Sequence, residues 1–143
     1  DICRSNCIRH GVRNRVHLVQ ADLSTCFAGK EQFSLITANP PYVSRAEMDA
    51  GMQPEVIEFE PLLALDGGSE GLLVIKRIAA SLPNILAPGG YFFMEIGADQ
   101  GVVVKKLMVE SAPPGMYESV DILQDYNARD RVVEARRKSK CSG

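Results

Sequence analysis

Four consecutive residues, Asn39-Pro40-Pro41-Tyr42, combine groups that can hold a planar nitrogen in a reactive orientation. Asn39 offers a side-chain carbonyl as acceptor, Pro40 offers a backbone carbonyl, and Tyr42 offers a flat face. An amide or amino nitrogen is a poor nucleophile because its lone pair is delocalised. To accept a methyl group, its N–H bonds must be held by hydrogen-bond acceptors and its lone pair must point at the donor carbon. We therefore predict that Asn39, Pro40 and Tyr42 are catalytic through orientation and electrostatic fit. The alternative is a plain Pro-Pro turn in which the asparagine and tyrosine have no role.

A strand must position this turn. Phe33, Leu35 and Ile36 form an apolar, β-branched run that predicts a buried strand. Prolines lack the backbone donor and have a fixed φ, so the chain leaves the sheet directly after this strand. The carboxyl end of a strand is where open α/β sheets place their ligand sites.

The pattern along the chain alternates between helical and strand periodicity, which predicts an open Rossmann-like α/β sheet. The first half of the chain is expected to contain a helix over 1–10 closed by Gly11, a strand over 16–20, the strand from Phe33, and a helix begun by the capping box 44–47. An irregular segment over 51–69 and a helix over 72–86 should follow. The second half is expected to contain a turn at 88–90, a strand over 91–96, a helix over 97–110, and an antiparallel pair formed by 120–123 and 131–135.

Composition narrows the class of protein. The 143 residues suit one domain, and a net charge of -2 gives no general attraction to nucleic acid. No apolar run reaches the ~20 residues of a membrane span. The four cysteines (Cys3, Cys7, Cys26 and Cys141) contain no Cys-x-x-Cys pair, so we predict free thiols in a reducing cytoplasm and no metal site. Because the first residue is Asp1, we expect the chain to be cut or started internally.

The turn and four further motifs carry a resemblance. Asn39-Pro40-Pro41-Tyr42 after an apolar strand resembles the signature of S-adenosylmethionine-dependent methyltransferases that act on planar nitrogens. The additional motifs follow in the order found in the HemK/PrmC family, which methylates the glutamine of peptide chain release factors, and the match runs from about residue 5 to residue 136. These motifs are Glu58–Leu72, Leu86–Gly90, Glu95–Gln100 and Asp130–Val133.

The resemblance implies methyl transfer from S-adenosylmethionine to the side-chain amide nitrogen (N5) of a glutamine in a release factor. It implies a cytoplasmic enzyme with a protein substrate, without a membrane or direct nucleic-acid contact. The substrate-binding residues that it indicates are Asn39, Pro40, Pro41, Tyr42 and Glu60.

The resemblance also assigns residues to the cofactor. Asp22 and Leu23 correspond to positions beside the adenine of S-adenosylmethionine, and Asn39 to a position at the reacting centre. From the residues alone, Asp22 is better explained as a turn residue or a cap.

Parts of the family pattern are missing. The helical recognition domain, the glycine-rich cofactor loop and the strand that ends in the ribose-binding acid have no counterpart; Asp1 stands too close to Asn6 to be that acid. We therefore expect residues 1–143 to be a partial catalytic domain that is inactive alone. The first two strands would be absent between the Val16 strand and the Phe33 strand. The apolar strand edges left open would favour re-pairing or a dimer.

Two other functions stay open. One is a nucleic-acid amino methyltransferase that acts on an extruded base, which predicts a basic groove and more aromatic residues. The other is a non-catalytic Rossmann-like interaction fragment, in which the turn is retained but no cofactor binds.

Overall fold

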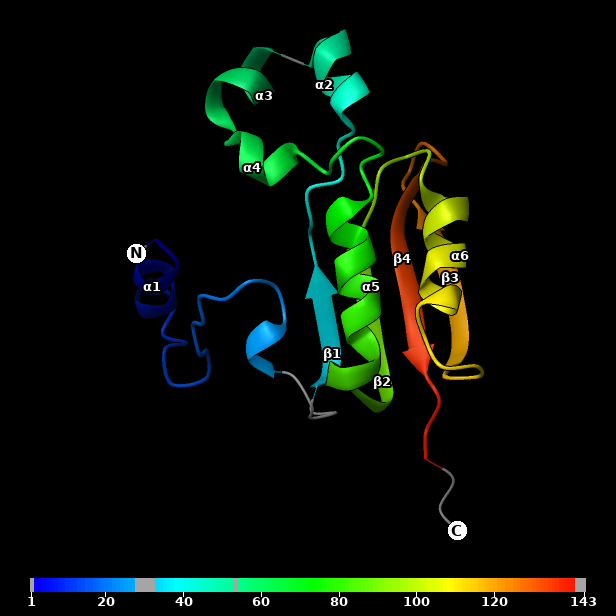
Figure 1. Ribbon diagram of the computed structural model, residues 1–143. Coiled ribbons are helices and arrows are strands. Elements are labelled where there is room, and N and C mark those ends of the chain that lie inside the picture. The colour runs from blue at the N-terminus through cyan, green and yellow to red at the C-terminus, as the bar shows by residue number, and fades with distance from the viewer. Residues whose placement is uncertain (1, 28–32, 53, 141–143) are drawn as a thin grey trace.

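Helices and strands alternate from β1 onward much as the sequence predicts (Figure 1). The computed structural model describes residues 2–27, 33–52 and 54–140. The elements are α1 (Ile2–Arg9), η1 (Thr25–Phe27), β1 (Phe33–Ala38), α2 (Arg45–Ala50), α3 (Pro54–Phe59), α4 (Leu62–Leu65), α5 (Leu73–Ile85), β2 (Leu86–Glu95), α6 (Gly101–Glu110), β3 (Tyr117–Gln124) and β4 (Asp130–Arg137).

The strands form one mixed sheet in the order β1-β2-β4-β3. β1 and β2 are parallel, and the connection between them contains α2–α4 and ends in the long helix α5, as in the βαβ unit of Rossmann-like sheets. β4 is antiparallel to both of its neighbours and lies between β2 and β3. The α/β class and the antiparallel closing pair are therefore confirmed.

The core lies between the sheet and the two long helices α5 and α6 (Figure 1). Phe92 and Met94 alternate along β2 toward this side and are fully buried, together with Ile75 and Leu82 of α5 and Val104 of α6. The other sheet face is less covered: Leu35 in β1 is 57% exposed, and none of the six residues of β1 is fully buried, so the prediction of a buried strand at Phe33 is wrong. The apolar pattern thus positions the strand ends, and with them the turn after β1.

The strand expected over Val16–Gln20 is not formed: these described residues adopt no regular structure, and Val16 and Leu18 are exposed. A β-strand needs a neighbour to take up its backbone hydrogen bonds, and no described strand pairs with this segment. The predicted helix before this segment is confirmed as α1. Gly11 closes it with φ 64, and the Val12 N–H donates to the Cys7 carbonyl. Asp1 lies outside the described residues.

Two further expectations are corrected. The segment 51–69 contains the short helices α3 and α4, and each begins at or next to a proline, which suits the first turn of a helix. Residues 88–90 are part of β2, although Gly89 has φ 76 and the pairing with β1 shifts register there. The predicted capping box is confirmed, because Ser44 and Glu47 exchange side-chain and backbone hydrogen bonds at the start of α2.

Within the described part of the chain, Cys3, Cys7 and Cys26 are free, and Cys141 lies outside it. The described residues contain no group of histidine, cysteine or carboxylate side chains that is arranged to hold a metal ion. Among the described helices, none has the length and apolar character that a membrane crossing requires.

Candidate functional site

The turn at 39–42 leaves the sheet at the carboxyl end of β1 and passes under the small helices α2–α4 (Figure 1). Just beyond it, Val43 is anchored to the segment after α4. Its N–H donates to the Leu65 carbonyl (N···O 3.0 Å), and its carbonyl accepts from Gly67 (2.9 Å). These bonds replace the sheet pairing that the prolines prevent, so the turn keeps a fixed place.

A cavity of about 450 Å³ opens at this turn. Asn39, Pro40 and Tyr42 line one side, and Glu60 from the end of α3 lines another, so the structure brings four of the predicted site residues together. Pro41, also predicted to bind substrate, stands in the turn but does not line the cavity. The remaining lining is Val43, Met52, Val56, Ala64, Leu65 and Glu95. A mainly apolar wall with a few polar groups is typical of a pocket that orients a small planar group.

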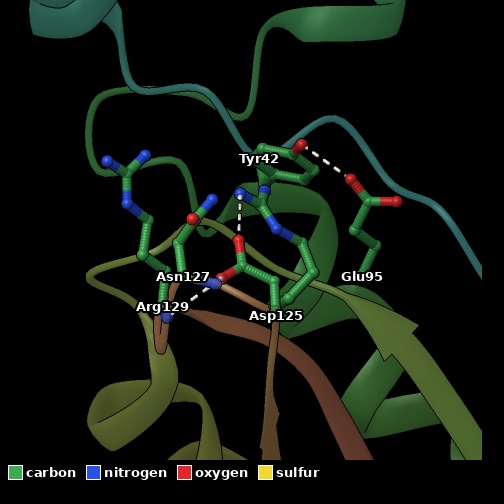
Figure 2. Close-up of polar contacts among 6 residues, drawn as sticks. Tyr42, Glu95, Asp125, Asn127 and Arg129 are labelled. Carbon is green, nitrogen blue, oxygen red and sulfur yellow. Dashed lines mark hydrogen bonds and ion pairs between the residues drawn. The ribbon is translucent and has the colours of Figure 1, made fainter.

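The side chain of Tyr42 is held at the edge of this cavity by a carboxylate. Its hydroxyl donates to Oε1 of Glu95, the last residue of β2, over 2.8 Å (Figure 2). Burial raises the pKa of Tyr42 most, and the hydrogen bond and negative charge of Glu95 raise this pKa further. Tyr42 is therefore a neutral hydrogen-bond donor at neutral pH.

The backbone of Tyr42 is held from the opposite direction. Gln100 donates from Nε2 to the Tyr42 carbonyl (2.9 Å) and, more weakly, to the Gly71 carbonyl (3.4 Å), while its Oε1 accepts from Gly97 N–H (2.9 Å). Gly71 has φ 70, and a Cβ there would lie 2.2 Å from the Tyr42 carbonyl oxygen. Only glycine lets the two backbone segments approach this closely.

Known proteins similar to this chain share one description. A protein of Geobacter sulfurreducens called release factor glutamine methyltransferase is 38% identical over 135 residues, which is 94% of this chain and 45% of that protein. Proteins with the same description from Cereibacter sphaeroides and Moorella thermoacetica are 43% and 35% identical over 94% and 97% of this chain. Over most of its own length, the chain is homologous to proteins of this description.

The family resemblance covers only part of these relatives. The chain spans slightly less than half the length of each, with 46% of the Cereibacter protein and 47% of the Moorella protein covered. No protein-family model matches the chain. A solved structure of a release factor-specific protein-(glutamine-N5) methyltransferase from Alicyclobacillus acidocaldarius aligns with 80% of this chain and 87% of that one, at 18% identity and a TM-score of 0.42.

A methyltransferase needs a methyl donor, and the resemblance assigns Asp22 and Leu23 to the donor's adenine. In the structure neither residue lines the cavity at Asn39. The Asp22 carboxylate instead forms an ion pair with Arg77 of α5 (2.5 Å), and Leu23 is partly exposed with φ 53. The structure therefore does not bring Asp22 and Leu23 to the cavity at which Asn39, Pro40, Tyr42 and Glu60 meet.

Sequence reasoning missed the residues that hold the turn. Glu95, Gln100 and Gly71 were recognised only as parts of motifs, without a role. The one local signal was Glu95, an acid at the end of an otherwise apolar strand. The contacts join residues 53 and 58 positions apart, and no spacing rule connects residues at such distances.

Proposed function

We propose that this chain is the acceptor-binding part of a longer methyltransferase that transfers a methyl group from S-adenosylmethionine to the side-chain amide of a glutamine in a peptide chain release factor. The observation that carries the proposal is the convergence of Asn39, Pro40, Tyr42 and Glu60 on one cavity at the carboxyl end of β1. The description shared by the relatives supports the same substrate. The release factor belongs to translation, so the reaction takes place in the cytoplasm.

The cavity suits a primary amide because the groups match in number and kind. An amide nitrogen has two N–H donors, and the Asn39 side-chain carbonyl and the Pro40 backbone carbonyl are two acceptors at adjacent positions. The face of Tyr42 supports the plane of the amide, and Glu60 bounds the pocket on the α3 side. When both N–H groups are hydrogen-bonded and the amide lies flat against Tyr42, one face of the nitrogen stays open to the methyl donor. This fixed orientation lowers the barrier to methyl transfer.

The longer protein is proposed from the lengths of the relatives and from the exposed strand β1. Among the described strands β1 pairs with β2 alone, and its Leu35 is 57% exposed. An open apolar edge is a place where further strands add. In the longer methyltransferase that contains these residues, such strands would cover β1 and supply the donor site.

The proposed substrate can be tested by incubating the longer methyltransferase with a radiolabelled methyl donor and candidate substrates. We expect label on wild-type release factor and none on a variant in which its acceptor glutamine is replaced by alanine. Ribosomal RNA and DNA serve as competing substrates, because an amino methyltransferase for bases would use a similar turn. A base in a duplex must first be flipped out at a cost of a few kcal/mol, whereas a glutamine on an extended loop reaches the cavity directly. Label on nucleic acid, or equal label on the alanine variant, contradicts the proposal.

The chain alone should bind S-adenosylmethionine weakly or not at all. The reason is that Asp22 is engaged by Arg77 and that only the acceptor side of the site is assembled. Isothermal titration calorimetry of the 143-residue chain should show no binding in the micromolar range. Micromolar affinity would mean that a second copy of the chain, paired along the open edge of β1, completes the donor site; the oligomeric state measured in the same sample would show this.

A further inference from the structure

Two residues of opposite charge from neighbouring strands, Glu95 and Arg131, act on the Tyr42 hydroxyl. Glu95 ends β2, and Arg131 stands near the start of β4, where its carbonyl accepts from Ile96 N–H over 2.9 Å. Tyr42 and Arg131 together line a second cavity of about 540 Å³, which Glu60 does not line. The charge and hydrogen bonding of Arg131 lower the pKa of the Tyr42 hydroxyl, whereas the charge and hydrogen bond of Glu95 raise this pKa.

Arg131 is itself held by the loop between β3 and β4. Its guanidinium pairs with the Asp125 carboxylate at 3.7 Å, and its side chain is only 35% exposed. Oδ1 of Asp125 accepts from the backbone N–H groups of Asn127 (2.8 Å) and Arg129 (3.1 Å), which closes the loop around the carboxylate (Figure 2). The hydrogen bond from Arg129 is the main reason that the pKa of Asp125 is lowered. Asp125 therefore stays charged and gives Arg131 a fixed partner.

We propose that Arg131, anchored by Asp125, is a positioning residue that fixes the ring of Tyr42 as a wall of the acceptor cavity. This inference rests on the proposed function, because it concerns the amide that the ring would support. One hydrogen bond to Glu95 leaves the ring free to tilt about that bond. The charged guanidinium of Arg131, which acts on the same hydroxyl and is itself fixed by Asp125, restricts this freedom and links the turn after β1 to the β3–β4 loop.

The first test measures Tyr42 directly and needs no catalysis. The chain has four tyrosines and no tryptophan, so tyrosine ring carbons labelled at Cζ give few signals, and Tyr42→Phe identifies one of them. Arg131→Gln removes a group that lowers the Tyr42 pKa and should raise this pKa, while Glu95→Gln removes groups that raise it and should lower it. Arg136→Gln is the matched control on the same strand: its guanidinium lies over Tyr91, so the Tyr42 pKa should not change. An unchanged Tyr42 signal in Arg131→Gln overturns the inference.

The second test measures methyl transfer by the longer methyltransferase. Arg131→Gln should lower kcat about tenfold with the KM for the donor changed less than about twofold, since a misplaced wall costs orientation and not donor binding. Arg131→Lys keeps the positive charge and should recover most of kcat, and Arg136→Gln should keep all of it. A normal kcat in Arg131→Gln, or an equal fall in Arg136→Gln, overturns the inference.

The two tests separate the possible failures. If the wild-type enzyme transfers no methyl group to the release factor, the proposed function is wrong, and the role of Arg131 falls with it. If the wild type is active but Arg131→Gln changes neither the Tyr42 signal nor kcat, only the role of Arg131 is wrong.

Discussion

Replacing Asn39 by alanine should lower the turnover of the longer methyltransferase by about 100-fold, on the scale of losing one preorganised polar contact to the reacting group. Asn39 is exposed on the cavity wall, and the side-chain contacts among the described residues show no other partner for it. Its carbonyl is therefore free to meet an amide N–H. The measurement is single-turnover methylation of release factor at saturating donor.

The donor affinity of the Asn39→Ala enzyme should change much less than its turnover. Thr37→Ala is the matched control, because Thr37 is an exposed residue of β1, two positions before Asn39, and does not line the cavity. Asn39→Asp is a sharper probe, since it retains an acceptor but adds a charge and removes a donor. Near-normal turnover in both Asn39 variants would remove Asn39 from the mechanism.

Gly71→Ala should destabilise the chain by about 3 kcal/mol. A left-handed backbone costs a non-glycine residue about 1–2 kcal/mol, and an overpacked contact costs about 1–3 kcal/mol more. Both costs apply here, because Gly71 has φ 70 and its added Cβ would lie 2.2 Å from the Tyr42 carbonyl oxygen. Urea unfolding followed by far-ultraviolet circular dichroism gives the free energy of unfolding.

Gly11→Ala separates the two costs. Gly11 has a similar φ of 64, but a Cβ there meets nothing within 4 Å, so only the backbone cost of about 1–2 kcal/mol should remain. The difference between the two variants measures the close approach of Gly71 to Tyr42. Equal losses would mean that the turn moves aside without cost and that Gly71 does not hold it in place.

The features predicted correctly are those encoded by neighbouring residues. The capping box needs only Ser44 and Glu47, and α5 follows from apolar residues at helical spacing that end up buried on one face. The strand expected at Val16 failed because pairing depends on another segment and not on the β-branched residues themselves. The helices α3 and α4 were missed although Pro54 and Pro61 mark helix starts, since each helix is too short to show a period.

The residues of the candidate site likewise fall into those that the sequence could identify and those that it could not. Asn39, Pro40 and Tyr42 could be chosen from their types and adjacency, and Glu60 only from the family resemblance. What keeps Tyr42 in place could not be chosen, because Glu95 and Gln100 become neighbours of the turn only after β2 and α6 are packed. A sequence shows which groups are available for chemistry, whereas the residues that hold those groups in place depend on the order of strands in the sheet.

The position of β4 has a consequence for how the protein is made. β4 is the last strand along the chain, yet it lies in the sheet between β2 and β3, and these two strands pair with β4 and not with each other. During synthesis β2 and β3 leave the ribosome before β4, so each waits with an unpaired edge until residues 130–137 emerge. Arg131 arrives with that strand. The contact proposed to fix Tyr42 therefore cannot form before these residues emerge, and a nascent chain that stalls before Asp130 exposes strand edges at which chains aggregate.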